Sequence, residues 1–379
     1  MSTRVQTLVP ARSRIIGDPL LIVAVAVIVG VGATSLHGAT WPTEGGVSDD
    51  LVRQIAFLIV GAAAFIGASR INYRLLRSAH ALLYLGGVGA LLLVLVAGTQ
   101  EFGARRWFAV GSHSLQPAEF ARLATVVTVA TLASRREPRL RSFFFVSLLF
   151  AMPTLLILVE PDLGSSLVLT AACLAMMIVW PVPLRVVGGV AAAVLGLVPL
   201  GFALAVPAYQ RERLAVFLDP DRDPLGSGFT LRQVEVALGS GGMMGRGLAT
   251  AGSALEGLAT RSSDFALAQI GEQLGLAGTL AVVLAFAVIA WRGLAIAHAA
   301  PDRFGQLLAV GVTTLLVVPG ILHIAVNVRL FPATGIPLPF VSLGGSALIA
   351  ASVGAGLLLS IASRQPPNPK ERWTGARWD

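Results

Sequence analysis

Long runs of apolar residues, separated by short polar segments, dominate the chain. A helix needs roughly 20 consecutive apolar residues to cross a bilayer core, and ten runs meet that criterion. They lie at 19–36, 52–69, 80–97, 118–133, 143–159, 164–180, 184–206, 265–290, 305–328 and 345–363. The pattern predicts an all-α integral membrane protein with ten transmembrane helices and a large loop, 207–263, between the seventh and eighth helices.

Composition agrees with this pattern. Of the 379 residues, 55% are hydrophobic and only 13% are charged, whereas soluble domains carry about 25% charged residues. No soluble domain of useful size fits between the apolar runs, so we expect residues 1–379 to form one polytopic membrane domain. The first apolar run is followed by further spans, so we expect it to be retained rather than cleaved as a signal peptide. The single cysteine, Cys173, excludes a disulfide framework within the chain and a multi-cysteine metal site.

The basic residues define an orientation. If the N-terminus is cytoplasmic, the cytoplasmic ends of the ten spans carry 17 of the 28 basic residues but only 5 of the 20 acidic ones. This asymmetry is the positive-inside pattern. It predicts cytoplasmic tails at 1–18 and 364–379 and places the 207–263 loop outside the cytoplasm. The net charge of +8 is therefore a topology signal, and we do not expect a nucleic-acid partner.

The loop after the third span and the start of the fourth carry clustered charge. Arg105 and Arg106 face outward beside Trp107, which is typical of an interfacial aromatic belt with snorkelling arginines or of an anion-binding site. Glu119 and Arg122 are three residues apart in the fourth span, so they share a helix face and can pair. Charges within a span usually face an inner cavity. A purely structural pair is the other interpretation.

Two polar segments follow outside the membrane. Asp162, in the sequence EPDLGSS after the fifth span, either caps the next helix or contributes to a site. The loop 207–263 begins like a calcium loop but lacks its glycine and its bidentate glutamate. Its glycine run, 239–247, lacks the features of a phosphate-binding loop, so we interpret it as a tight re-entrant turn packed against helices. Positive charge near an anionic ligand could come from Arg211, Arg213 and Arg246.

Acidic residues also enter the eighth span. Asp264 stands at its start, where an N-cap is one interpretation, and Glu272 lies about 80° further around the helix, so that both can border one cavity. The last outer loop is rich in proline and glycine and is not helical, so we expect it to line a cleft. The sequence shows no Ser-His-Asp, zinc or Cys-His arrangement.

These segments together resemble one family. GARRWF…QPAEFARL, EPDLGSS, YQRERLAVFLDPDRDP, ALGSGGMMGRGL, SDFALAQIGEQLGLAG and PATGIPLPFVSLGGSA occur in the order seen in the SEDS proteins, which include RodA, FtsW and SpoVE. The resemblance spans nearly the whole chain. It implies a peptidoglycan glycosyltransferase of the bacterial plasma membrane that polymerises lipid II beside a class B penicillin-binding protein, surrounded by membrane lipid.

The resemblance also implies roles for particular residues. The essential aspartate of the family falls on Asp264, and its glutamate and basic residue in the fourth helix fall on Glu119 and Arg122. We expect Asp264 to act as a general base on the acceptor hydroxyl, with inversion at the sugar. Substrate binding is expected of Arg105, Arg106, Trp107, Asp162, Arg211, Arg246, Glu272, Pro337, Ser342 and Gly344. A divalent cation, Mg²⁺ or Mn²⁺, is compatible with the diphosphate, but the sequence does not establish one.

Other interpretations remain open on the sequence. Polar residues among membrane helices would equally serve a flippase or transporter for the same lipid-linked precursor. A non-catalytic scaffold that holds a penicillin-binding protein is the third interpretation. The sequence does not distinguish a role in elongation from a role in division.

Overall fold

The computed structural model describes residues 17–44, 49–101, 104–111, 113–180, 208–248 and 263–365, with short pieces of 185–196 and 253–258. Most of the predicted seventh span, 184–206, lies outside the described residues, as do nearly all of the tails 1–18 and 364–379.

Nine of the ten predicted spans coincide with a helix of the described chain. These helices are α1 (Pro19–Glu44), α2 (Asp49–Arg70), α3 (Leu76–Ala97), α4 (Pro117–Ser134), α5 (Leu140–Val159), α6 (Leu163–Val179), α10 (Ala266–His298), α11 (Arg303–Asn327) and α12 (Gly345–Ala362). Seven of the helices in the described part are long and apolar enough to cross a membrane; α4, which carries Glu119 and Arg122, and the 17-residue α6 are not among them. The chain is thus a predominantly helical, multi-pass membrane protein.

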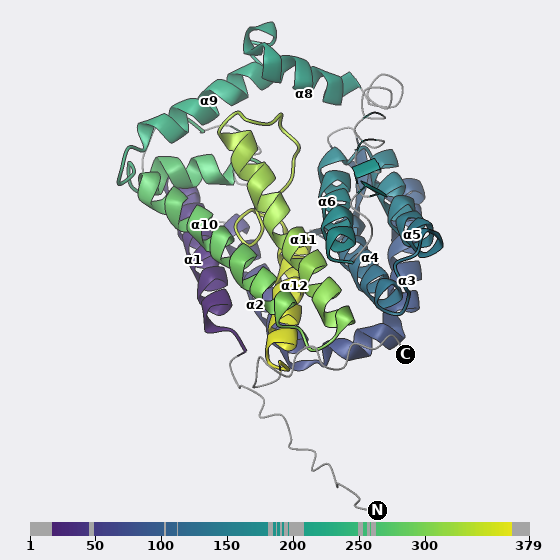
Figure 1. Cartoon of the computed structure of the whole chain (residues 1–379). Helices are drawn as coiled ribbons and strands as arrows, with labels where there is room; N and C mark the ends of the chain where they lie inside the picture. The colour runs from purple at the N-terminus through teal and green to yellow at the C-terminus, as the bar shows by residue number, and fades with distance from the viewer. Residues whose placement is uncertain are drawn as a thin grey trace, which may run out of the picture.

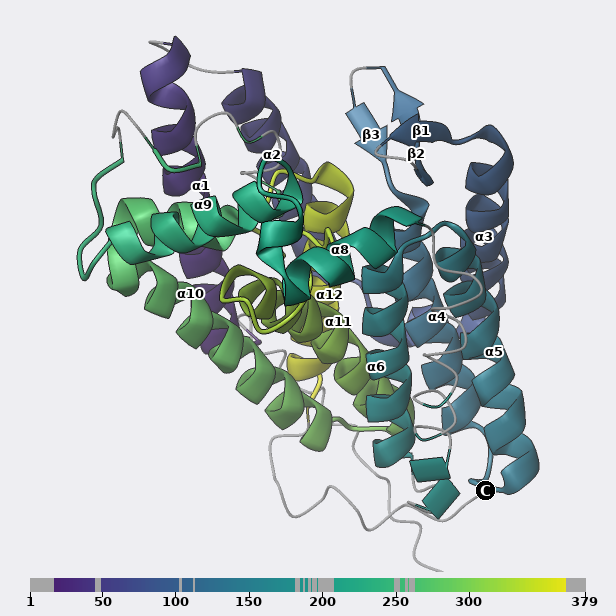
Figure 2. The same cartoon turned by 90° about the horizontal axis from the view of Figure 1, so that it is seen from above.

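The loop between α3 and α4 contains strands, which the all-α prediction did not include. It forms a small antiparallel sheet of β1 (Thr99–Glu101), β2 (Ala104–Val110) and β3 (His113–Leu115), in that order. Figure 2 shows the sheet beside α3 in the view from above. The prediction missed it because β1 and β3 have only three residues each and the β2 sequence, ARRWFAV, does not alternate polar and apolar residues. Pairing between neighbours supplies most of the stability of such strands.

The large loop contains secondary structure of its own. It includes α8 (Ala208–Leu218), the 3₁₀ turn η2 (Pro220–Arg222) and α9 (Ser227–Ser240). Figure 1 shows α8 and α9 lying across one end of the bundle, and Figure 2 shows α8 running over the bundle between α6 and α12. These helices therefore cover the end at which Asp264 begins α10.

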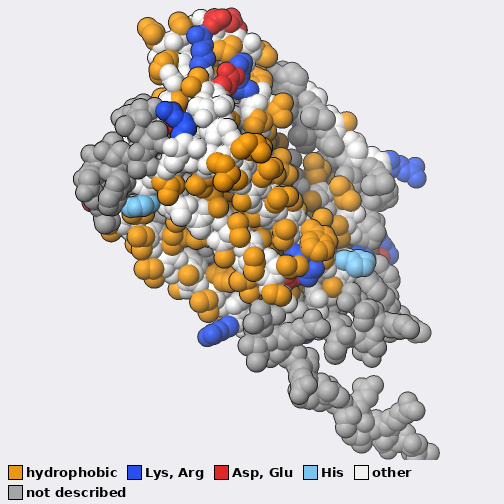
Figure 3. Space-filling model, turned by 90° about the vertical axis from the view of Figure 1, so that its left-hand side faces the viewer, with side chains coloured by type: hydrophobic (Ala, Val, Ile, Leu, Met, Phe, Trp, Pro, Cys, Tyr) orange, Lys and Arg blue, Asp and Glu red, His pale blue; other side chains and the backbone are white. Residues whose placement is uncertain are grey.

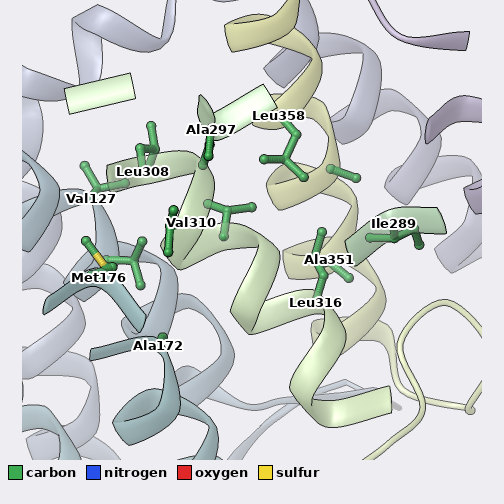
Figure 4. Close-up of a cluster of buried hydrophobic side chains, with 14 of the residues drawn as sticks. Val127, Ala172, Met176, Ile289, Ala297, Leu308, Val310, Leu316, Ala351 and Leu358 are labelled. Atoms are coloured by element: carbon green, nitrogen blue, oxygen red, sulfur yellow. The ribbon is translucent and has the colours of Figure 1, made fainter. Parts of the chain in front are cut away.

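The core lies around α11, which packs against α4, α6, α10 and α12. Figure 4 shows Val127 of α4, Met176 of α6, Ile289 of α10, Leu316 of α11 and Leu358 of α12 in one buried cluster. The outer helices instead expose apolar side chains, as a protein surrounded by lipid does. Figure 3 shows one such surface, where hydrophobic side chains cover the middle of the face and most charges lie towards its ends.

Candidate functional site

Asp264 stands at the entrance to α10, where two other segments hold its backbone. The side-chain amide of Asn327, at the end of α11, donates to the Asp264 carbonyl at 3.3 Å. The hydroxyl of Ser342 donates to the neighbouring Ser263 carbonyl at 2.6 Å. The amide oxygen of Asn327 also accepts from the Ala268 N–H at 3.0 Å, so it satisfies one of the unpaired donors of the helix start. The N-cap residue of α10 is Phe265, whose side chain makes no capping hydrogen bond, so the N-cap interpretation of Asp264 is wrong.

Two arginines act on the Asp264 carboxylate. Burial raises its pKa above the ordinary value for aspartate, while a hydrogen bond from Ser263 and the positive charges of Arg213 and Arg106 oppose that rise. Arg213 of α8 also donates to the Ala333 carbonyl at 3.3 Å. A Cβ placed on Gly335 would lie 3.7 Å from an Arg213 nitrogen and 3.9 Å from an Asp264 oxygen. Arg213, Asp264 and the last outer loop therefore border one space.

The turn between α5 and α6 forms another wall of this site. Asp162 caps α6 by accepting from the Ser165 N–H at 2.9 Å, and its second oxygen accepts from the Gln116 amide at 3.0 Å. The capping interpretation of Asp162 is confirmed, and its role in substrate binding stays a prediction. Gln210 of α8 donates to the Pro161 carbonyl at 2.6 Å, so the loop helix is anchored directly on this turn.

Glu160, the first residue of the same turn, is the acid that the predicted site omitted. Its side chain is buried, with 1% of the residue exposed, and neither carboxyl oxygen has a hydrogen-bond partner in the described chain. Burial and the nearby charge of Asp162 raise its pKa to about 8, against the opposing influence of Arg106. Arg106 therefore acts on both Glu160 and Asp264. The sequence does contain a signal for Glu160, namely an acid followed by a proline at the junction of two helices. The prediction chose Asp162, two residues later, because an aspartate there can cap the next helix.

Glu119 and Arg122 form the ion pair that their spacing predicts, and both side chains are buried. Two of the Arg122 guanidinium nitrogens, Nε and Nη1, have no hydrogen-bond partner in the described residues. The pair lines a pocket together with Pro337 of the last outer loop and side chains of α11 and α12. A guanidinium with unused donors beside such a pocket is suited to an anionic ligand.

The glycine run forms a tight turn packed against a helix, as we predicted, and it docks into a break in α10; that it re-enters the membrane stays a prediction. At Gly275 the backbone leaves the helical conformation, with φ 66° and ψ −160°. The Arg246 and Gly247 N–H groups donate to the carbonyls of 272 and 273, while the 276 and 277 N–H groups donate to the turn. The turn thereby satisfies the backbone groups that the break leaves unpaired.

Glu272 faces this turn. Its carboxylate accepts from Arg246 at 3.3 Å, from the Ser253 hydroxyl at 2.6 Å and from the Ala254 N–H at 2.9 Å. We expected Glu272 to border one cavity with Asp264, but all of its hydrogen-bond partners in the described chain come from residues 246–254. The structure brings Arg246 and Glu272 to each other, and their contact with substrate stays a prediction.

The remaining predicted residues differ in their surroundings. Arg105 and Arg211 are exposed, whereas Arg106 is half-buried and lies over the Trp107 ring, 5.6 Å from its centroid. Ser342 is buried and acts on backbone groups, accepting from the Leu338 N–H at 2.8 Å. Gly344 directly precedes α12.

The divalent cation that we left open finds little support in the described residues. They contain no group of three or more His, Cys, Asp or Glu side chains arranged to hold a metal ion. Both Asp162 oxygens are already used, and Arg106 lies close to Glu160. We therefore derive no step through a metal.

The described chain is a bundle of apolar helices that carries, at one end, a carboxylate under the influence of two arginines. These features are typical of a membrane protein with a polar reaction or binding site at its rim. The chain belongs to the FtsW/RodA/SpoVE family, described as "Cell cycle protein", whose family model matches residues 19–366. It is similar to the peptidoglycan glycosyltransferase MrdB of Escherichia coli, with 33% identity over 324 residues, covering 85% of this chain and 88% of that one. Stage V sporulation protein E of Bacillus subtilis is 33% identical over 356 residues, covering 91% and 96%.

A solved structure shows the same fold. It was reported as "Structural coordination of polymerization and crosslinking by a peptidoglycan synthase complex". One of its chains matches this one with a TM-score of 0.76 and 28% identity, covering 94% of this chain and 98% of that chain. The likeness extends over nearly the whole of both chains.

Proposed function

We infer that this chain is a peptidoglycan glycosyltransferase that builds glycan strands for cell shape or division. The family and the names of its relatives support the reaction class. The observation that carries the assignment to a site is Asp264, which directly precedes the N-cap residue of α10 and whose partly buried carboxylate is influenced by the charges of Arg213 and Arg106.

The substrate we propose is lipid II, a disaccharide-peptide on a polyprenyl diphosphate. Asp264 takes the proton from the acceptor 4-hydroxyl while that oxygen forms a bond to the donor anomeric carbon. The bond from that carbon to the diphosphate breaks, and the configuration inverts. A raised pKa makes a carboxylate a stronger base, and general-base assistance is typically worth about 10²–10⁴-fold. Nearby guanidinium groups, Arg106 and Arg213 at the rim and Arg122 deeper in the bundle, would stabilise the leaving diphosphate.

The topology we propose has ten transmembrane helices, both termini in the cytoplasm and the 207–263 loop outside. Two ionic links at the end opposite the loop helices support it. Arg292 contacts Asp18 at 2.6 Å, and Arg74 contacts Asp302 at 2.9 Å. These pairs join the residues just before α1 and α11 to residues near the end of α10 and just before α3, all of which are predicted to be cytoplasmic. The membrane we propose is the plasma membrane of a bacterium. The class B penicillin-binding protein is proposed as the partner, in keeping with the polymerization and crosslinking named for the solved complex.

The test uses purified full-length protein and fluorescent lipid II. Asp264→Asn keeps the size and polarity of the side chain but removes the base, so we expect glycan ladders to fall by at least about 100-fold. Asp221→Asn, an exposed aspartate of the same loop, is the matched control and should polymerise normally.

Other outcomes would overturn the proposal. Normal ladders from Asp264→Asn would remove Asp264 from the mechanism. Movement of lipid II between leaflets by the unsubstituted protein, without ladders, would indicate a flippase. Neither activity in the presence of the penicillin-binding protein would indicate a scaffold.

A further inference from the structure

Two exposed methionines stand in the glycine turn, residues 241–247, and the proposed function has no use for them. Met243 is 70% exposed and Met244 is 83% exposed. Adjoining apolar side chains on a surface mark a contact with another protein or with a membrane. The surroundings of the turn indicate which of these covers the two methionines.

The turn lies at the level where α10 becomes a membrane span. It docks at the break in α10, where the Leu276 N–H donates to the Gly242 carbonyl at 2.9 Å and the Ala277 N–H donates to the turn at 3.2 Å. The part of α10 after the break, 276–298, is about 34 Å long at 1.5 Å per residue. This length matches the hydrocarbon core of a bilayer, which is about 30 Å thick. The turn therefore lies at one end of a span.

The first helix ends at the same level. The apolar part of α1 covers Pro19–Gly38, and a Cβ placed on Gly38 would collide with the carbonyl oxygen of Leu248, which directly follows the turn. Figure 1 shows the turn after α9 beside the start of α10, at the left edge of the view. Two separate spans thus place the turn at one boundary of the bilayer.

The backbone and the charges of the turn are compatible with lipid. Irregular backbone at membrane depth is tolerated where protein satisfies its polar groups, and this turn exchanges hydrogen bonds with α10 in both directions. Residues 236–245 carry no charge. The two flanking charges are held in ion pairs, Glu235 with Arg329 and Arg246 with Glu272.

The surface next to the turn is apolar. Leu276, Leu280 and Leu284 follow each other at four-residue spacing on α10, and all three are exposed. Residues four apart lie on one face of a helix, so these side chains form a stripe that begins where the turn docks. Because the stripe belongs to a membrane span, lipid covers it, and the exposed methionines extend the same apolar surface beyond the span.

We propose that Met243 and Met244 insert into the acyl chains of the leaflet next to the loop helices, and that they anchor the glycine turn at the membrane boundary. Unbranched methionine side chains adapt readily to irregular apolar surroundings. The anchor holds the break in α10 at the edge of the hydrocarbon core. This inference requires only that the chain spans a membrane, and it does not rest on the proposed function.

The first test is oxidation of methionine by hydroxyl radicals generated in water, applied to the full-length protein in lipid nanodiscs that hold one copy. Leu225→Met is the matched control, because Leu225 is 91% exposed in the same loop. Figure 1 shows the connection between α8 and α9, which contains this residue, away from the bundle. We expect Met243 and Met244 to stay unoxidised, like the buried Met176, while the methionine introduced by the control is oxidised.

The second test identifies lipid as the cover. A fluorescent group is attached to Met244→Cys in a Cys173→Ala background, which removes the one native thiol. Nitroxides on phospholipid acyl chains should quench its fluorescence, and iodide in the water should not. The same group on Leu225→Cys should show the opposite pattern.

Each outcome decides the proposal. If Met243 and Met244 are oxidised as fast as the introduced methionine, they lie in water and the proposal is wrong. Protection from oxidation without quenching by the acyl-chain nitroxides also overturns it, because protein would then cover the two side chains. Nanodiscs with one copy exclude a second copy as that cover. Neither measurement involves polymerisation, so both results leave the proposed function intact.

Discussion

Two glutamates of this chain are buried to nearly the same extent, but their surroundings are opposite. Glu272, in α10, is 3% exposed and accepts three hydrogen bonds, which hold the glycine turn and the 253–254 segment. Glu160, at the α5–α6 turn, is 1% exposed and has none in the described chain.

The difference separates an acid that joins two segments from one that joins none in the described chain. A buried carboxylate with a full set of donors stabilises the segments that it joins. A buried carboxyl without them opposes folding when ionised, and such groups with a shifted pKa cluster at functional sites. Sequence pattern alone would rank the two residues the other way, because Glu272 lies within a membrane helix and Glu160 only at its end.

The largest effect is expected where the glycine turn enters α10. Gly275 has φ and ψ values that are essentially restricted to glycine, and a Cβ there would collide with the Gly245 backbone nitrogen. Gly275→Ala should lower the free energy of unfolding by about 3 kcal/mol or more, measured by thermal or denaturant unfolding in detergent. The control, Gly239→Ala, lies in exposed helix α9 with open space around it, and should stabilise by up to about 1 kcal/mol. Equal behaviour of the two variants would show that the break at Gly275 is not required.

The two glutamates should respond in opposite directions to the same substitution. Glu272→Gln weakens charge-assisted hydrogen bonds and should lower the free energy of unfolding by about 2 kcal/mol. At neutral pH the unfolded chain has an ionised Glu160, which must take up a proton on folding, and this costs free energy. Glu160→Gln removes that cost and should raise the free energy of unfolding at neutral pH. Both are measured by unfolding in the same detergent.

The pH dependence of stability provides the check on this pair. Native Glu160 keeps its proton up to about pH 8, whereas the unfolded chain releases it near 4.5. Unfolding therefore releases a proton between these values, and stability falls as pH rises, by about 1.4 kcal/mol per pH unit. Glu160→Gln should lack this contribution. A slope identical to that of the unsubstituted protein would mean that Glu160 is ionised in the native state.

The smallest effect is expected from the substitution of Arg105, although its neighbour Arg106 should have a clear effect. Arg105 and Arg106 are neighbours in β2, but Arg105 is exposed and Arg106 is half-buried near Glu160 and Asp264. Arg105→Ala should change KM for lipid II by no more than about twofold. Arg106→Ala should raise it by about tenfold or more, as expected for loss of hydrogen bonds to a charged group. Similar values for both would place the substrate over the outer face of the sheet.

Much of the fold could be predicted from the sequence, because the relevant forces are local. Apolar runs of sufficient length must form helices in lipid, where each backbone group needs a partner within the segment. The Glu119–Arg122 pair follows from helical spacing, and the re-entrant turn follows from glycines in an otherwise apolar region. The sheet at 99–115 could not be predicted in this way, because its outer strands have three residues each and its middle strand does not alternate polar and apolar residues.

The sequence by itself determined where nine of the helices lie and which end carries the polar loops, and it predicted Asp264 as a site residue. Only the tertiary structure decided what each charge does there. Asn327 replaces Asp264 as the partner of the helix start, Arg246 contacts Glu272, and Asp162 caps α6. The physical reason is that helices depend on hydrogen bonds within one segment, whereas the state of a charge depends on burial and on groups brought from distant segments.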